Sequence, residues 1–252
     1  MEAMREQENR TRRLLGRAAL EVLHGAHVAV FGVGGVGGHA AEVLVRSGVG
    51  QISLFDADTV APSNLNRQIV ALHSTLGRYK VDVMAERARD INPEIRVNAC
   101  RLFYSEETAD QVDVTAFDYV LDCIDTVSAK LLLIERCRAA QVPILCSMGA
   151  ANKLDPMAFR VADLSRTAVD PLARVVRLGC RRRGITGVKV VYSEEPPLPP
   201  LPEEQDDGET PAAGRRAVPA SNAFVPAACG LLMGREALHD LLAAHGLWRG
   251  TK

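Results

Sequence analysis

Four glycines and one aspartate are the residues of this sequence whose types and spacing most clearly indicate chemistry. They are Gly32, Gly34, Gly35 and Gly37, which satisfy the spacing GxGxxG with one extra glycine, and Asp56. Glycine allows a positive φ and lets a phosphate approach the backbone closely. A carboxylate about 20 residues later can accept hydrogen bonds from ribose hydroxyls. The pattern predicts a nucleotide site, although close packing of a helix on a sheet would also favour glycine.

The segments around these residues have the patterns needed to position them. An apolar run at 28–31 predicts a buried strand, an apolar face over 40–45 predicts a helix, and 51–55 predicts a second strand that ends at the aspartate. A helix that begins at the glycines directs free N–H groups and the positive end of its dipole toward a phosphate. Together these elements form the nucleotide-binding βαβ unit, which binds NAD, FAD and ATP alike.

A polar stretch after the aspartate favours ATP among these nucleotides. The further candidates for contact with the nucleotide are Asp58, Asn64, Arg67, Gln68 and Lys80. Arginine suits bidentate contacts with phosphate, and lysine supplies a point charge. Cleavage of a triphosphate needs groups that neutralise charge on the phosphates. Amides and two cations near the phosphate end of the ligand meet this need.

The rest of the chain alternates between predicted strands and helices, which indicates an α/β fold. Further strands are expected at 95–100, 119–123, 142–146 and 157–161, with another that contains Lys189. Helices are expected at 6–23, 80–92, 126–141 and from Asp170 to residue 184, with a short helix capped by Ser105 at 105–111. The apolar segment at 224–242 is interpreted as a buried strand or helix followed by a terminal helix.

Asp125 and Thr126 follow the strand expected at 119–123, and ligands bind beyond the carboxyl ends of strands in such folds. Asp125 is a candidate ligand of Mg²⁺, because a carboxylate and waters usually hold this ion. A cap of the following helix is the alternative for Asp125, and the two roles are compatible. Small residues at 147–152 would leave room for a substrate over the nucleotide, and an ordinary loop explains them about as well.

Several motifs resemble those of the ubiquitin-activating-type adenylating enzymes, a family that includes the activators of bacterial sulfur-carrier proteins. These motifs are GVGGVGG, FDADTVAPSNLNRQ, GRYK, INPEIRV and LDCID. The stretches RTRRLLG, MAERARDINPE and DLSRTAVDPLARVVR are most similar to the family's branch of tRNA threonylcarbamoyladenosine dehydratases. The resemblance covers residues 10–192 and resumes at 221, so the proline-rich stretch between them lies outside it.

The resemblance implies a Rossmann-like ATP-binding fold whose mostly parallel central sheet is extended by the C-terminal part of the chain. Residues 1–252 are then a single adenylating-enzyme domain, with a helical arm at 1–26 and a nucleotide-binding part at 27–150. Residues 151–192 and 221–252 form the part that meets the substrate and a second subunit. Residues 193–220, rich in proline and acids, are expected to be a flexible crossover loop.

In this family a carboxylate attacks the α-phosphate of ATP and gives an acyl-adenylate and pyrophosphate. For the dehydratase branch, the carboxylate is that of N6-threonylcarbamoyladenosine beside the tRNA anticodon, and a nitrogen of the same modification then displaces AMP and closes a ring. The resemblance implies ATP and Mg²⁺ as cofactors, and allows a monovalent cation. It implies a homodimer, with a sulfur-relay or carrier protein as a further partner.

The expected catalytic residues are Arg67, Lys80, Asp125 and Arg13. In the family, an arginine of the N-terminal element crosses a dimer interface to the phosphates of the ATP bound by the other subunit. The stretch RLLG aligns Arg13 with this residue, with Arg12 as the alternative. Because several arginines crowd this segment, a solvated basic face is an equally good account.

The densest basic cluster of the sequence is a candidate RNA-binding surface. It comprises Arg174, Arg177, Arg181, Arg182, Arg183 and Lys189. Such a cluster suits the phosphates of RNA, and solvation alone would also explain it. Arg215 and Arg216 in the proline-rich stretch would meet the substrate if that stretch passes near the active site, whereas a disordered linker is the simpler interpretation.

The composition is that of an ordinary globular protein, with 47% hydrophobic and 24% charged residues among 252. No apolar run reaches the ~18 residues of a membrane span, and the N-terminus resembles neither a signal peptide nor a typical transit peptide. We therefore expect a cytoplasmic protein with no membrane partner. The net charge of −1 gives no global attraction to nucleic acid, so RNA would have to bind a local patch.

The six cysteines are scattered and form no CxxC pair, which argues against structural zinc and against the zinc-bearing sulfur-carrier activators. Cys180 and Cys229 lie where a thioester-forming cysteine would be sought, but neither has a motif that indicates a lowered pKa.

Two functions stay open beside the dehydratase. One is adenylation of the C-terminal glycine of a ubiquitin-like or sulfur-carrier protein, and the other is a non-catalytic nucleotide-binding scaffold. An NAD oxidoreductase is less favoured, because no hydride-transfer residue is evident.

Overall fold

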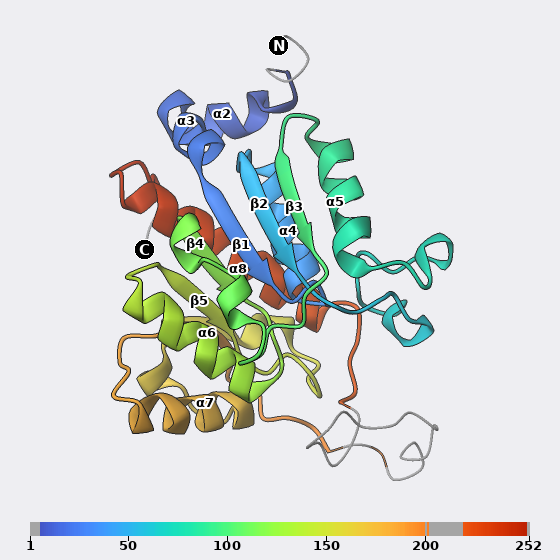
Figure 1. The fold of residues 1–252 in the computed structure, drawn as a ribbon, viewed down its shortest axis with the longest axis vertical. Helices are drawn as coiled ribbons and strands as arrows, with labels where there is room; N and C mark the ends of the chain where they lie inside the picture. Colours follow the sequence, from blue (N-terminus) through green and yellow to red (C-terminus); the bar gives the residue numbers. More distant parts are fainter. Residues whose placement is uncertain (1–5, 200, 202–218, 251–252) are drawn as a thin grey trace.

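The central element of the fold is a seven-stranded sheet in the order β3-β2-β1-β4-β5-β7-β6 (Figure 1). The computed structural model describes residues 6–199, 201 and 219–250. Neighbouring strands are parallel throughout except for β6, which is antiparallel to β7. The predicted Rossmann-like α/β fold, with a mostly parallel sheet that the C-terminal part extends, is confirmed.

The strands are short and the helices alternate with them along the chain. The strands are β1 His27–Phe31, β2 Gln51–Phe55, β3 Arg96–Cys100, β4 Tyr119–Asp122, β5 Ile144–Ser147, β6 Phe159–Asp163 and β7 Lys189–Ser193. The helices are α2 Asn9–Leu15, α3 Arg17–Gly25, α4 Gly37–Arg46, α5 Lys80–Ile91, α6 Val127–Ala139, α7 Pro171–Arg182 and α8 Val225–Ala243.

Helices cover both faces of the sheet and bury a hydrophobic core on each. Val28 and Val30 of β1 belong to the core under α4, α5 and α8, whereas Ala29 and Phe31 belong to the core under α6 and α7. This near-continuous burial is typical of parallel strands with helices on both sides. In Figure 1, α8 passes behind the sheet and α6 lies in front of it.

Some local predictions are wrong or need refinement. The N-terminal segment forms two helices rather than one, because Gly16 adopts φ 92° and ψ 164° between α2 and α3. The helix expected at 105–111 is a 3₁₀ turn at Ala109–Gln111, and its N-cap is Thr108 rather than Ser105. The apolar segment at 224–242 is the single helix α8, whose inner side is buried against α4 and the sheet.

No helix of the described ranges is both long and apolar enough to cross a membrane. Arg215 and Arg216, with most of the crossover loop predicted at 193–220, lie outside the described residues.

Candidate functional site

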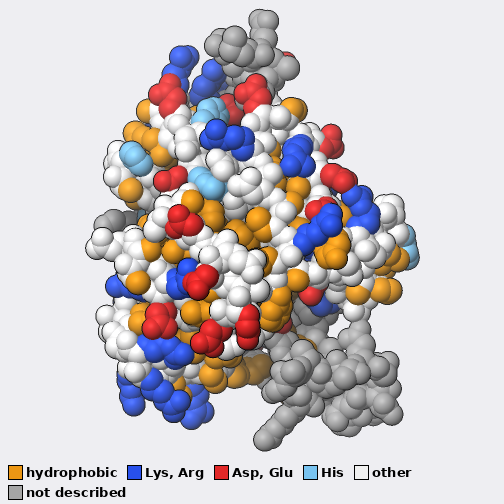
Figure 2. Space-filling view, viewed as in Figure 1, with side chains coloured by type: hydrophobic (Ala, Val, Ile, Leu, Met, Phe, Trp, Pro, Cys, Tyr) orange, Lys and Arg blue, Asp and Glu red, His pale blue; other side chains and the backbone are white. Residues whose placement is uncertain are grey.

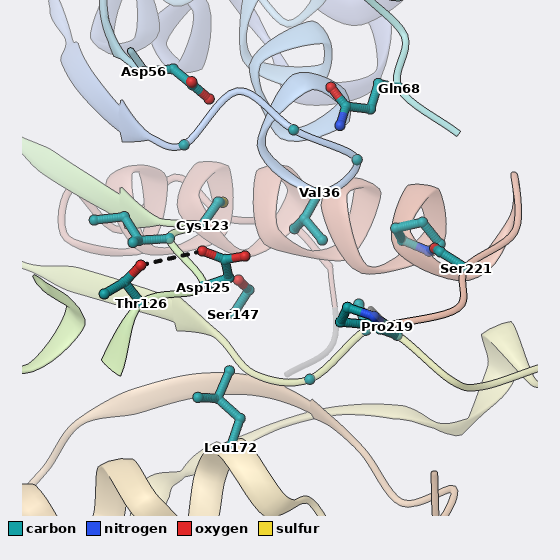
Figure 3. A pocket seen from close by; sticks show the side chains of 18 of the residues that line it. Val36, Asp56, Gln68, Cys123, Asp125, Thr126, Ser147, Leu172, Pro219 and Ser221 are labelled. Carbon is teal, nitrogen blue, oxygen red and sulfur yellow. Dashed lines mark hydrogen bonds between the residues drawn. The ribbon is translucent and has the colours of Figure 1, made fainter. Parts of the chain in front are cut away.

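A cavity of about 920 Å³ lies at the carboxyl ends of the central strands (Figure 3). Its walls come from the glycine turn after β1, the polar segment after β2, the loops after β3, β4 and β5, and the start of α7. This is where parallel α/β sheets bind their ligands. All the predicted nucleotide-binding residues except Gly37 line it.

The glycines of the turn have two different roles. Gly32 has φ 87°, and a Cβ there would lie 2.7 Å from the carbonyl oxygen of Cys123. A Cβ on Gly37 would lie 1.8 Å from the carbonyl oxygen of Gly32. These two positions therefore need glycine for packing. Gly34 and Gly35 line the cavity together with Gly32. A Cβ on Gly34 would meet nothing closer than Nε2 of Gln68, at 3.9 Å, so a phosphate can approach the backbone there, whereas a Cβ on Gly35 would lie 3.2 Å from Pro226.

The Asp56 carboxylate braces the glycine turn from the end of β2. Its two oxygens accept hydrogen bonds from the backbone N–H groups of Val33, at 2.7 Å, and Asp58, at 2.8 Å. Burial raises the pKa of Asp56, and the charge of Lys80 and these backbone bonds oppose that rise. Because a carboxylate offers about four lone-pair sites, Asp56 can still accept a bond from a ribose hydroxyl.

Lys80 is the first residue of α5, and its side chain is buried beside the cavity. Its Nζ lies 2.7 Å from Oδ2 of Asp58, whose own side chain is largely exposed. Arg67 donates through Nη1 to the carbonyl of Ser63 at 2.7 Å and to Oδ1 of Asn66 at 2.8 Å. An arginine has five N–H donors, so a guanidinium held in this way can also meet a phosphate.

Two buried amides support this part of the cavity differently. Asn64 accepts from the backbone N–H of Ala61 through Oδ1, at 3.1 Å, and so stabilises its own turn. Oε1 of Gln68 is buried and has no hydrogen-bond partner among the described residues. An unpaired buried polar group costs about 1–3 kcal/mol, so a ligand with a suitably placed donor would be stabilised here. Figure 3 shows Gln68 and Asp56 on the glycine-turn side of the cavity and Leu172 on the opposite side.

The loop after β4 is held by an ion pair that the sequence did not indicate. Nζ of Lys130 in α6 lies 2.8 Å from Oδ2 of Asp122, and neither side chain is exposed. Asp122 also accepts from the backbone N–H of Ile124, at 3.1 Å. The pair thereby fixes the chain that leads to Asp125 and Thr126. Thr126 occupies the N-cap position of α6, and its hydroxyl donates to Asp125 at 3.5 Å (Figure 3).

The wall opposite the glycine turn contains a second buried pair, Lys153 and Asp170. Asp170 caps α7 by accepting from the N–H of Ala173 at 2.9 Å, and it accepts from the N–H of Gly149 at 3.0 Å. Burial raises the pKa of Asp170 and lowers the pKa of Lys153. The Asp-Pro pair at the start of a helix could have indicated the cap, whereas no sequence signal marked Lys153.

The possible metal ligands fall into two places. Asp125 contributes one carboxylate to the cavity wall, which suits Mg²⁺ only together with phosphate oxygens and waters. Within the described ranges, one group of three residues has metal-binding spacing, Glu236, His239 and Asp240 of α8. Nζ of Lys189 lies 2.5 Å from Oε1 of Glu236 and 2.7 Å from Oδ1 of Asp240, so an ammonium group already balances these carboxylates.

The predicted RNA-binding cluster is divided by the structure. Arg174, Arg181 and Arg182 are exposed on α7, and Figure 2 shows basic side chains gathered at the lower left, where Figure 1 places α7. Arg183 pairs with Glu135 at 3.3 Å, and Arg177 donates to the carbonyl of Thr167 at 2.9 Å.

Lys189 does not belong to this surface, because its ion pairs are with α8 on the other side of the sheet. Sequence proximity placed it in the cluster, but side chains alternate between the two faces along a strand. Arg13 is exposed on α2 and does not line the cavity of its own chain.

The cysteines are in surroundings that disfavour a thiolate. Cys180 and Cys229 are buried, and burial raises the pKa of both thiols. Cys123 borders the cavity, and burial raises its pKa to about 12. Because the thiolate is the nucleophile, these surroundings favour the less reactive thiol form of all three residues.

Comparison with known proteins agrees with this geometry. The model of the ThiF family matches residues 7–247. The tRNA threonylcarbamoyladenosine dehydratase of Bacillus subtilis is 46% identical over 243 residues, which cover 95% of this chain and 96% of that protein. The Escherichia coli protein of the same name is 41% identical over 202 residues, or 77% of this chain and 75% of that protein.

Solved structures of the E. coli dehydratase have the same fold. Its complexes with AMP and with ATP superpose with TM-scores of 0.87 and 0.86, at 35% sequence identity and with 98% of both chains covered. The family match spans nearly the whole chain and the cavity is built as the motifs predict, so this protein is a member of the ThiF family.

Proposed function

We propose that this protein catalyses the ATP-dependent dehydration of N6-threonylcarbamoyladenosine in tRNA through a carboxyl-adenylate. The observation that carries the proposal is the convergence of the glycine turn, Asp56, Arg67, Lys80 and Asp125 on one cavity. The near full-length similarity to dehydratases, two of whose structures contain ATP or AMP, supports the same activity.

The nucleotide half of the cavity would bind ATP. Gly34 lets the phosphates approach the backbone at the start of α4, and Asp56 meets the ribose. Arg67 and Lys80 lie where they would neutralise the polyphosphate, as phosphoryl-transfer sites require. Asp125 would hold Mg²⁺, which when bound neutralises charge on the phosphates.

The reaction would need positioning rather than an enzyme nucleophile. The substrate carboxylate attacks the α-phosphorus, and the bond to the leaving pyrophosphate breaks. The adenosine N6 nitrogen then attacks the activated carbonyl carbon, loses its proton, and displaces AMP as the ring closes. The raised pKa values of Cys123, Cys180 and Cys229 favour this route over a thioester.

The proposed division of the chain follows from this scheme. Residues 27–150 would bind the nucleotide, whereas 151–192 and 221–252 would meet the substrate and a second subunit. Arg174, Arg181 and Arg182 would bind tRNA phosphates, and Arg13 would act across a homodimer. A cytoplasmic location, a monovalent cation and a sulfur-relay or carrier-protein partner stay predictions.

The test is ATP–pyrophosphate exchange with the purified full chain. Exchange and ring closure with tRNA that bears threonylcarbamoyladenosine, lost in Lys80→Ala, would support the dehydratase. Unmodified tRNA is the matched control, because it lacks the carboxylate. Exchange only with a ubiquitin-like or sulfur-carrier protein would replace the proposal by the second function, and ATP binding without exchange for any acceptor would favour a scaffold.

A further inference from the structure

We propose that Asn152 and Lys153 are positioning residues that hold the acceptor half of the cavity in place for the modified nucleoside. The two residues follow the small-residue loop after β5. They fasten both described ends of the connection between β7 and α8, residues 194–199 and 219–222, to the cavity wall. The inference rests on the proposed function and assigns these residues to one side of that site.

Asn152 binds both ends of the connection through its backbone and its side chain. Its carbonyl accepts from the N–H of Leu198 at 2.7 Å, and its own N–H donates to the carbonyl of Ala220 at 2.8 Å. Its Oδ1 accepts from the N–H of Ala220, also at 2.8 Å. Asn152 has φ 58°, a left-handed conformation in which asparagine is among the few side chains tolerated.

Lys153 repeats this arrangement one residue later. Its Nζ donates to the carbonyl of Glu195 at 2.6 Å, and its carbonyl accepts from the side chain of Asn222 at 2.8 Å. The Glu195 carboxylate completes the contact by accepting from the backbone N–H groups of Leu154 and Asp155, both at 2.9 Å. Both ends of the connection are therefore fixed at one point of the wall.

The charge of Lys153 is matched by a buried partner. Lys153 is 3% exposed, and its Nζ lies 3.8 Å from Oδ2 of Asp170. Asp170 in turn binds the N–H of Gly149, where a Cβ would approach Oδ2 to 2.9 Å. Loss of the ammonium would leave a buried carboxylate without its counter-charge, and the loop from Gly149 to Lys153 would lose its support.

The residues held in this way line the cavity on one side. Pro197, Pro219 and Ser221 contribute to its wall, and Figure 3 shows Pro219 and Ser221 on the side of the cavity away from Asp56. The two halves of the cavity are joined by a bond from Nδ2 of Asn66 to the carbonyl of Ser221, at 3.1 Å. The bonds that order the glycine turn and Lys80, such as Asp56 to Val33 and Lys80 to Asp58, do not involve Asn152 or Lys153. A substitution of Asn152 or Lys153 should therefore weaken binding of the acceptor nucleoside more than binding of ATP.

The experiment separates the two substrates. Lys153→Met keeps the length of the side chain and removes its charge, and Lys153→Arg keeps the charge. We expect Lys153→Met to raise the KM for modified tRNA about tenfold, with the Kd for ATP within about twofold of wild type, and Lys153→Arg to restore most of the loss. Lys80→Ala is the opposite control, since it should weaken ATP binding. Thermal unfolding of each variant excludes a loss of fold.

A pH profile provides a readout that a purely structural residue would not move. Burial lowers the pKa of Lys153, against the charges of Asp170 and Glu195, so the ammonium loses its proton at a lower pH than a free lysine. The KM for modified tRNA should rise at alkaline pH in wild type and stay flat in Lys153→Arg, because arginine remains charged.

Asn152 supplies a second, independent variant pair. Asn152→Gly keeps access to the positive φ and loses the Oδ1 contact, whereas Asn152→Ala loses both, so alanine should raise the KM for modified tRNA more than glycine. The inference would be overturned if Lys153→Met changed the Kd for ATP as much as the KM for modified tRNA. It would also be overturned if a folded Lys153→Met enzyme kept the wild-type KM for modified tRNA. Absence of activity in wild type would instead reject the proposed function.

Discussion

At the scale of single residues, a buried ion pair beneath the cavity holds the loop that carries Asp125. Asp122 and Lys130 lie 2.8 Å apart without solvent exposure, and Asp122 also accepts the N–H of Ile124. Such a pair is costly to desolvate, but removal of one partner is costlier because the other charge is left uncompensated. The pair thus fixes the loop that carries Asp125 at the carboxyl end of β4.

We predict that Lys130→Met lowers the free energy of unfolding by about 3–5 kcal/mol, because the Asp122 carboxylate loses its only described cation partner. Urea unfolding would measure the change. The matched control is the double variant Asp122→Asn with Lys130→Met, which removes both charges and should recover part of the loss. A single variant as stable as wild type would show that the loop does not depend on the pair.

At the scale of elements, α8 is attached to the sheet by polar contacts as well as by its apolar side. Asp240 accepts from the hydroxyl of Tyr119 in β4 at 2.6 Å and from Lys189 in β7 at 2.7 Å. Burial raises the pKa of Asp240, but the hydrogen bonds from Lys189, Tyr119 and His239 outweigh it and lower the pKa overall. These bonds hold the Lys189 ammonium against α8 rather than on the surface of α7.

We predict a pH-dependent loss of stability in Asp240→Asn. A carboxyl group whose pKa is lower in the folded than in the unfolded protein stabilises the fold above the unfolded pKa of about 3.9, and the effect is lost as pH falls through the folded value. The variant should be less stable than wild type by about 1–3 kcal/mol at neutral pH, and the difference should shrink in acid. A difference that is constant between pH 7 and pH 3 would exclude the ionised carboxylate as its source.

The exposed arginines of α7 give the second prediction at this scale. Replacement of Arg174, Arg181 and Arg182 by alanine should weaken tRNA binding and flatten its dependence on salt, because fewer counterions are released from the RNA. Filter binding at several salt concentrations would measure both effects. Arg96→Ala is the control, since Arg96 is exposed on β3 at the opposite edge of the sheet. An equal loss in the control would mean that α7 has no special role.

At the scale of the whole molecule, the local patterns predicted most of the fold. The βαβ unit and the order of later elements follow from hydrophobic runs, glycines and prolines, which act over short distances. The Lys153–Asp170 pair and the contact of Lys189 with α8 join residues far apart in sequence, so no local pattern could indicate them. The break at Gly16 was missed although its sequence signal is local, because a glycine inside a helical pattern can end the helix as a C-cap.

The cavity was predictable for a similar reason. Parallel strands bring their carboxyl ends to one edge of the sheet, so Asp56 and Asp125 were expected to line the same cavity once both were placed at strand ends. The wall at residues 149–153 was less predictable, because its geometry depends on bonds to Glu195, Ala220 and Asn222, which lie far away in sequence.

The last prediction concerns Arg13 in the N-terminal arm and its action on the site of a second subunit. Arg13 is exposed on α2 and does not line the cavity of its own chain. If it completes the site of a second subunit, Arg13→Ala and Lys80→Ala should each be inactive alone. Arg12→Ala tests the alternative arginine and should keep its activity.

A mixture of the two inactive proteins distinguishes action within one chain from action across an interface. In a mixed dimer, the site with Lys80 intact would receive Arg13 from the other subunit, while the second site lacks both groups. Random exchange of subunits makes half the dimers mixed, so activity should recover to about a quarter of wild type. No recovery after subunit exchange, verified by native mass spectrometry, would place Arg13 outside the site of the second subunit.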